Sequence, residues 1–208
     1  MNRFALMCFA GTFALATANA QEFSKFSFDF GGGYTVPAGS TGNYLNTGWG
    51  LRAGFGMNFS STLGAMINLG YDSMGIDSGT LGSIGVGGGD VNIFHATLDP
   101  VIHIFPHHRA SFYLTGGGGV FHRYQEFSNP TVVSTTAYIP FFGFYPVSFG
   151  ANQIVASYSV TKPGFDVGAG AEFGALGHGK FFTEAKWNHM FLAGGHTDYI
   201  PVSFGFRW

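Results

Sequence analysis

The stretch that decides the fold is Tyr199-Ile200-Pro201-Val202-Ser203-Phe204-Gly205-Phe206-Arg207-Trp208, at the end of the chain. Every second residue from Ile200 to Trp208 is large and apolar, and the residues between them are small or charged. This alternation predicts a β-strand with one apolar face. Because the small and charged residues form the enclosed set and the aromatic residues run to the last position, we expect the apolar face to contact lipid.

A strand in hydrocarbon needs a partner on both edges. Each unpaired N–H or C=O group there costs several kcal/mol, so open sheet edges do not persist in a membrane. We therefore expect this last strand to pair with the first one and close a barrel. The alternative is an ordinary strand of a water-soluble antiparallel sheet that happens to end on an aromatic residue.

The composition narrows the choice further. The 208 residues include 34 Gly and 25 Phe, only 10% are charged, and the net charge is -2. This length fits one domain. The near-neutral charge, without a basic stripe, argues against binding to nucleic acid. Helical and disordered proteins need more charged or helix-forming residues than the chain has, so an alternating sheet is the remaining class.

The N-terminus has the pattern of a secretory signal. Asn2-Arg3 precedes an apolar run from Phe4 to Leu15, and Ala18-Asn19-Ala20 has the small residues of a cleavage site. We predict a signal peptide over residues 1–20 and a barrel domain over residues 21–208. Cys8, the one cysteine, lies inside the predicted signal, so the exported chain is expected to have no disulfide.

The rest of the chain repeats the alternation of the last strand. Strands are predicted at residues 26–36, 49–59, 65–72, 91–104, 112–121, 164–173, 181–189 and 199–208. Pro100 removes a donor from the fourth of these, so a bulge or local distortion is expected there. The longer connections are predicted at residues 37–47, 73–90, 124–158 and 191–198, and they alternate with short turns. The predicted fold is all-β: an eight-stranded antiparallel transmembrane barrel, an up-and-down meander with long extracellular loops and short periplasmic turns.

Several motifs resemble the second half of small OmpA-like outer-membrane β-barrel domains. They are Thr161-Lys162-Pro163-Gly164, Val167-Gly168-Ala169-Gly170-Ala171-Glu172, Glu184-Ala185-Lys186-Trp187 and Pro201 to Trp208. The resemblance implies the bacterial outer membrane and recognition of the Trp208 end by the barrel assembly machinery. OmpA carries a peptidoglycan-binding domain after the barrel, whereas this sequence stops at Trp208. The simpler OmpX-like barrels are therefore the closer comparison, and a cell-wall tethering role is not implied.

Charged residues of both signs are predicted to point into the lumen. They are Arg52, Glu172, Glu184, Lys186 and Arg207. An eight-stranded barrel is just wide enough for side chains to fill, so these charges should pair. The pairs would form a structural network that plugs the interior, or alternatively a gate or narrow selectivity region. The glycines from Gly116 to Gly119 are expected to let large neighbours pack in this narrow space.

No catalytic residue, metal site or other cofactor is predicted. His103, His107 and His108 surround one turn, but no cysteine and no carboxylate except Asp99 accompanies them, so a solvated periplasmic turn is expected. His122, His189 and His196 are expected near the outer interface. Barrels that resemble the lipid A deacylase use an outward-facing His with a nearby Ser. Asn188-His189-Met190 has no serine two residues on, and the register predicts no Ser, His and acid at one height of adjacent strands.

The connection at residues 124–158 is unusually rich in aromatic residues. Those that could form a contact surface are Tyr138, Phe141, Phe142, Phe144 and Tyr145. Exposed aromatic surface often marks an interaction site. The alternatives are that this segment folds back over the barrel mouth or continues the strands above the membrane.

The sequence therefore predicts a monomeric outer-membrane barrel with a structural or surface-interaction role through its outer loops. Its expected partners are outer-membrane lipid and lipopolysaccharide. The first alternative is a narrow passive pore for ions or small solutes, and the second is a barrel enzyme that modifies lipid A.

Overall fold

A computed structural model describes residues 25–105, 110–174 and 179–208. The predicted signal segment, residues 1–20, lies outside the described residues, as do His107 and His108. Within these three ranges no helix is long and apolar enough to cross a membrane.

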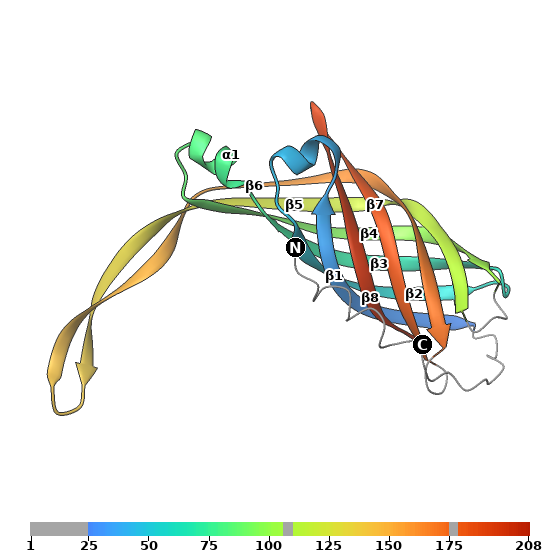
Figure 1. The fold of residues 1–208 in the computed structure, drawn as a ribbon, viewed down its shortest axis with the longest axis horizontal. Coiled ribbons are helices and arrows are strands. Elements are labelled where there is room, and N and C mark those ends of the chain that lie inside the picture. The colour runs from blue at the N-terminus through green and yellow to red at the C-terminus, as the bar shows by residue number, and fades with distance from the viewer. Residues whose placement is uncertain (1–24, 106–109, 175–178) are drawn as a thin grey trace, which may run out of the picture.

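Eight antiparallel strands form a closed barrel, as Figure 1 shows. They are β1 Phe26–Pro37, β2 Gly48–Asn58, β3 Leu63–Gly75, β4 Gly88–Ile104, β5 Ala110–Ile139, β6 Gly143–Gly174, β7 Lys180–Leu192 and β8 Gly195–Arg207. Two short helical turns, η1 (Gly39–Asn43) and α1 (Ser78–Ser83), lie in the connections β1–β2 and β3–β4. The predicted fold class is confirmed.

The last strand closes the barrel on the first, as the lipid-facing pattern requires. Phe30 lies opposite Phe206, and Tyr34 lies opposite Val202. Beyond the ladder, the Trp208 N–H donates to the Phe28 carbonyl at 2.8 Å, and the Phe28 N–H donates to the Trp208 carbonyl at 3.0 Å. Closure leaves no open edge in the wall, which is the condition for a sheet in hydrocarbon.

Within the barrel wall, most side chains alternate along the strands between the lumen and the outside. On β8, Ser203 and Arg207 are buried and Phe204 between them is exposed. The outward residues of the other strands are predominantly apolar in the same way, for example Phe28 and Phe30 on β1 and Leu98 on β4. An apolar outer surface around a polar interior is the arrangement of a membrane-spanning barrel.

Two of the long connections consist of paired strand rather than loop. Residues 124–158, predicted as the longest loop, continue β5 and β6 as one ladder up to Ile139 opposite Gly143, and only Val155, at a register shift, and residues 140–142 remain unpaired. Residues 191–198 are also strand, with a turn at Ala193-Gly194. The prediction of loops here was wrong because Ser, Thr and Gly were interpreted as turn residues. Several of them pair across the ladder, as Ser134 and Ser148 do through their hydroxyls at 2.8 Å.

The connection predicted at residues 73–90 is shorter in the structure because β3 and β4 extend into it. Met74 lies opposite Val91 in this extension. The remaining residues contain α1, which Asp77 caps by accepting a hydrogen bond from the Gly79 N–H at 2.8 Å. An aspartate in this position satisfies free N–H groups of the first turn.

Pro100 does not cause a bulge. Leu98 pairs with Gly118 and Val101 pairs with Thr115, so the ladder between β4 and β5 lapses at Asp99 and Pro100 and resumes in the same register. The expected distortion is thus a gap in the pairing. A register shift occurs instead between Phe127 and Ser128, where β5 and β6 leave the barrel wall.

Candidate functional site

The structure places all five predicted lumen residues inside the barrel. Arg52 comes from β2, Glu172 from β6, Glu184 and Lys186 from β7, and Arg207 from β8, and each is buried. Each occupies the inward position of its strand, so the alternation of the sequence directs the five side chains into one space. Buried charges need partners, and most of the partners come from other strands.

Arg207 ties β8 to β1 and β6. Its guanidinium donates from Nη2 to Asp29 Oδ2 at 2.6 Å and from Nε to the same oxygen at 3.1 Å. It also pairs with Glu172, which Lys180 contacts at 2.9 Å. The guanidinium carbon lies 4.8 Å from the centre of the Tyr113 ring, so an aromatic face covers part of the charge.

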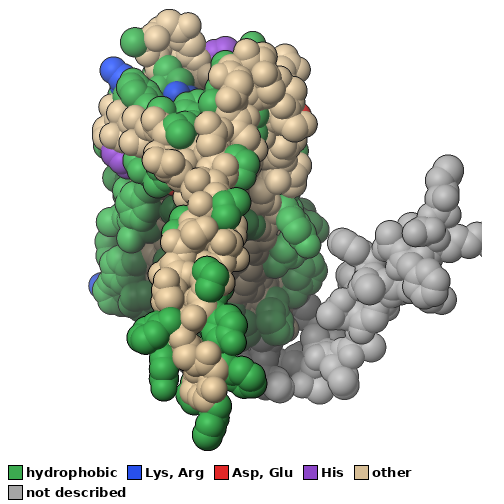
Figure 2. Space-filling view, turned by 90° about the vertical axis from the view of Figure 1, so that its left-hand side faces the viewer, with side chains coloured by type: hydrophobic (Ala, Val, Ile, Leu, Met, Phe, Trp, Pro, Cys, Tyr) green, Lys and Arg blue, Asp and Glu red, His purple; other side chains and the backbone are tan. Residues whose placement is uncertain are grey.

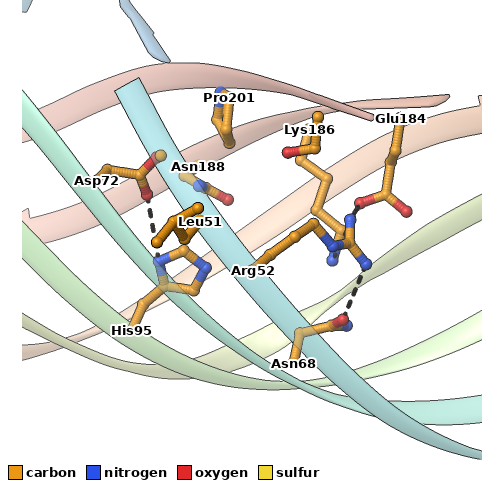
Figure 3. A pocket seen from close by; sticks show the side chains of 11 residues that line it. Leu51, Arg52, Asn68, Asp72, His95, Glu184, Lys186, Asn188 and Pro201 are labelled. Atoms are coloured by element: carbon orange, nitrogen blue, oxygen red, sulfur yellow. Dashed lines mark hydrogen bonds and ion pairs between the residues drawn. The ribbon is translucent and has the colours of Figure 1, made fainter. Parts of the chain in front are cut away.

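Arg52 is the second cation of the network (Figure 3). It pairs with Glu184 on the opposite wall and donates to Asn68 Oδ1 at 3.0 Å. Glu184 also accepts a hydrogen bond from the Tyr113 hydroxyl at 2.8 Å. The strands β2, β3, β5 and β7 are therefore linked across the lumen.

Lys186 is the third cation and pairs with Asp99 on β4. Its ammonium lies 3.5 Å from Asp166 and 4.0 Å from Glu184. Asp99 accepts a further hydrogen bond from the Asn68 amide at 2.6 Å, which joins this pair to the Arg52 group. Arg52 Nη2 also lies 3.4 Å from Asp29 Oδ2, the partner of Arg207, so Arg52, Lys186 and Arg207 belong to one connected network that crosses the barrel interior.

Sequence reasoning missed the carboxylates that hold these cations in place. Asp29, Asp99 and Asp166 are buried partners of the network, and all three occupy inward positions of their strands. The alternation placed each of them inward, so the signal was available. What it did not give is the relative height of residues on distant strands, which decides which charges meet.

A second polar group lies beside the network and lines a small cavity (Figure 3). His95 Nδ1 is 3.5 Å from Asp72 and 3.3 Å from the Tyr199 hydroxyl, and Thr35 donates to Asp72. The cavity has room for about one water molecule. Asn188 also lines it.

An apolar cluster fills the lumen toward the end that carries η1 and α1. Its buried members come from five strands, from α1 and from the β3–β4 connection: Met74, Ile76, Leu81, Val91, Ile93, Phe121, Met190 and Tyr199. We call these residues the apolar plug. Leu81 belongs to α1, so this helix packs onto the plug. The sequence did not predict the plug, because residues 73–90 were interpreted as a solvated loop.

A histidine and an acid of β8 meet a serine of η1 at the outer end, whereas the prediction concerned adjacent strands and did not cover this turn. His196 Nε2 lies 3.4 Å from the Ser40 hydroxyl and 3.4 Å from Asp198 Oδ2, and His189 Nδ1 lies 2.6 Å from Asp198 Oδ1. Ser40 comes from η1. The alternation within strands could not predict that η1 packs beside β8. In a catalytic triad the acid binds one ring nitrogen and the serine the other. Here both contacts of His196 use Nε2, so the histidine cannot be oriented by the acid and accept a serine proton at the same time.

Of the described histidines, His103 and His122 are placed singly. His103 packs against Tyr113 with ring centres 5.9 Å apart, and His122 Nδ1 contacts the Thr161 hydroxyl at 2.7 Å. Among the described residues no group of three or more His, Cys, Asp or Glu side chains is arranged to hold a metal ion.

The aromatic residues predicted as a contact surface lie at the free end of the β5–β6 extension. Tyr138 and Phe144 face each other across the ladder with ring centres 5.3 Å apart. The exposed fraction of the residue is 103% for Phe141, 70% for Phe142 and 75% for Phe144. The segment does not fold back over the mouth. β5 and β6 continue as a two-stranded ladder, which projects to one side of the barrel (Figure 1).

The closed ring, the apolar outer face and the filled lumen define a class, the small eight-stranded outer-membrane β-barrels. Known structures of this class superpose on the chain. Neisserial surface protein A aligns with a TM-score of 0.57 at 11% identity, over 88% of this chain and 96% of that one. A major outer-membrane protein of Thermus thermophilus gives a TM-score of 0.54 at 9% identity, over 88% and 98%.

Ail, the attachment invasion locus protein of Yersinia pestis, gives a TM-score of 0.51 at 17% identity, over 88% of this chain and 97% of that one. At such identities the likeness concerns the fold. No protein-family model and no curated protein sequence matches the chain.

Proposed function

We propose that this protein is a closed outer-membrane barrel that acts through the parts exposed outside the membrane, in a structural or surface-interaction role. The observation that carries the proposal is the filling of the lumen at successive heights. The charged network holds Arg52, Lys186 and Arg207 in ion pairs, and the apolar plug lies on the outer side of it. A path for hydrated ions would have to break both.

The outer surface supports a contact role better than a transport role. The extension of β5 and β6 carries exposed aromatic side chains that make no contribution to the barrel wall. Ail, one of the similar structures, has been solved in complex with the heparin analogue sucrose octasulfate. That ligand is strongly anionic, whereas the extension here has no Lys or Arg, so we expect a different kind of partner for this chain.

Single-channel conductance in a planar bilayer separates this proposal from the alternative of a narrow passive pore. With insertion verified by heat-modifiable migration of the recovered protein, we expect a silent bilayer. Discrete, reproducible conductance steps from the wild-type barrel would contradict the closed lumen and would favour the pore.

We further propose that the barrel has no catalytic activity on lipid A. His196 contacts both Ser40 and Asp198 through the same ring nitrogen, Nε2. This arrangement does not provide a nucleophile activated by a base that the acid orients. We expect lipid A incubated with the purified protein to keep its acyl chains, as mass spectrometry would measure. A loss of acyl chains that Ser40→Ala abolishes would contradict this.

The remaining expectations belong to the same proposal. The protein is taken to be a monomer, exported by the segment at residues 1–20 and recognised by the barrel assembly machinery through the Trp208 end. Trp208 is exposed and packs on Phe206 with ring centres 4.8 Å apart, so its side chain is accessible on the outer face of the barrel.

A further inference from the structure

We propose that the extension of β5 and β6 lies on the outer leaflet of the same membrane, beside the barrel mouth, with its aromatic tip at the boundary between lipid headgroups and acyl chains. We call residues 129–153 the outer ribbon, from Asn129 opposite Gln153 up to the turn at residues 140–142. This inference deepens the proposed function, because it names the partner of the exposed aromatic residues. It rests on the barrel being in the outer membrane.

The rest of the described chain contacts the outer ribbon at its base, where the Gly87 N–H donates to Asn129 Oδ1 at 2.7 Å. The pairing of β5 with β4 ends at Ser128, and the pairing of β6 with β7 ends at Gly164, so beyond these points the two strands pair only with each other. An isolated two-stranded hairpin is marginally stable in water. A surface that covers one side of the ribbon would stabilise it.

The absence of charged residues from the ribbon limits the kind of surface that can cover it. From Phe127 to Thr161 the sequence has no Lys, Arg, Asp, Glu or His, although Glu126 and Lys162 stand directly outside these limits. A partner recognised by its charge would find no complementary group. Serine, threonine, asparagine and tyrosine side chains with Val and Phe between them suit an interface where polar headgroups meet acyl chains.

The direction of the ribbon places it over lipid. Figure 1 shows that the extension bends away from the barrel axis after leaving the wall and projects to one side of the mouth. In Figure 2 hydrophobic side chains gather at its free end. The same two strands contribute Phe112, Leu114 and Val167 to the lipid-facing wall, so the ribbon is continuous with a surface that already contacts lipid.

The tip has the residues that membrane interfaces favour. Tyr138, Phe141, Phe142, Phe144 and Tyr145 are all exposed, and none of them packs on the barrel. Tyrosine combines an apolar ring with a hydroxyl that can bond to headgroups, and phenylalanine can enter the acyl region. The open edges of the ribbon limit how deeply it can enter the membrane, because unpaired backbone groups are not tolerated in the hydrocarbon centre. We therefore place the ribbon in the interface and not across the leaflet.

Strand addition by a second copy or by a peptide fits the ribbon less well. A methyl group built on Gly87, next to the end of β4, would touch the ring of Pro130, so the proline nitrogen faces the open edge of β5. Thr136 has the same orientation in an alternating strand and lies opposite Pro146. Each open edge thus lacks one N–H donor, and proline on an edge is a common protection against edge-to-edge pairing.

The test uses a fluorophore at the tip of the ribbon. Cys8 is the single cysteine, so a Cys8→Ser background with Phe141→Cys accepts one environment-sensitive label. The matched control is Ser83→Cys on α1, which is exposed at the same end of the barrel. Both proteins are placed in phospholipid nanodiscs that hold one copy or two copies, with or without nitroxide-labelled lipid.

We expect the label at position 141 to emit at shorter wavelength than the label at position 83, and to be quenched several-fold more by the nitroxide lipid. Equal emission and equal quenching at the two positions would overturn the proposal. A shift that appears only in discs with two copies would also overturn it, in favour of contact between copies. Either result would leave the closed lumen intact, whereas a conducting barrel would contradict the proposed function without changing this measurement.

Discussion

At the scale of single residues, the lumen charges link parts of the chain that are distant in sequence. Arg207, one residue before the end, contacts Asp29 on the first strand and Glu172 on the sixth. A salt bridge of this kind adds little net stability over an apolar substitute, but loss of one partner leaves a buried charge uncompensated. The network therefore makes the correct closure of the barrel more favourable than a closure that leaves these charges unpaired.

Glu184→Gln should lower the thermal stability of the barrel in detergent. The change removes the negative charge that faces Arg52. The Tyr113 hydroxyl would then donate to an amide oxygen in place of a carboxylate oxygen. Breaking a buried pair costs about 3–5 kcal/mol in general, so the midpoint of heat-modifiable migration should fall clearly. Glu126→Gln is the matched control, because Glu126 lies outside the lumen and its contact is with the Tyr124 hydroxyl. Equal midpoints for wild type and Glu184→Gln would contradict the pairing.

Gly119→Ala should also destabilise the barrel. A methyl group there would lie 2.0 Å from the carbonyl oxygen of Ala96, which belongs to the backbone of β4 and cannot move aside. The expectation that Gly116 to Gly119 make room for large side chains was therefore wrong, because the atom nearest to a methyl group at each of the four would be a backbone oxygen. Overpacking costs about 1–3 kcal/mol. Gly150→Ala on the outer ribbon has open space and should leave the unfolding midpoint unchanged; a similar effect of both changes would count against this contact.

At the scale of elements, the outer ribbon is separable from the barrel. Replacing residues 130–152 by a two-residue Asn-Gly turn keeps every pair of β5 with β4 and of β6 with β7. We expect the shortened chain to refold into detergent micelles with the same heat-modifiable migration. A failure to refold, with the full-length chain refolding in parallel, would mean that the ribbon is needed for barrel assembly.

The elements that the sequence predicted correctly are those in which one face contacts lipid. In β1 and β8 the outward aromatic residues alternate with small or charged ones, and this contrast marks each strand unambiguously. The outer ribbon was not predicted as strand because both of its faces are exposed and both combine Thr with Val. With no buried side, the alternation that identifies a strand disappears.

The candidate site was predicted in part for a related reason. Alternation decides which residues point inward, so Arg52 and Glu184 were assigned to the lumen from the sequence. Which inward residues meet depends on the stagger of strands around the barrel, and no local pattern contains it. The meeting of Ser40 with His196 has the same origin, because η1 reaches a strand at the other end of the chain.

At the scale of the whole molecule, two layers of different chemistry occupy the lumen of the barrel. The charged network is held by ion pairs among at least five strands, and the apolar plug is held by burial of side chains such as Phe121 and Tyr199. Loss of one layer leaves the other in place. We therefore expect either layer alone to block the passage of ions.

The most direct test of the closed lumen is single-channel conductance of four proteins measured side by side. They are the wild type, a plug variant Phe121→Ala with Met190→Ala, a network variant Arg52→Ala with Glu184→Ala, and the protein that combines both pairs of changes. We predict that the first three are silent and that the combined variant alone conducts. Steps from the wild type, or from either variant with one layer changed, would contradict the account and show an open path beside the layer that remains.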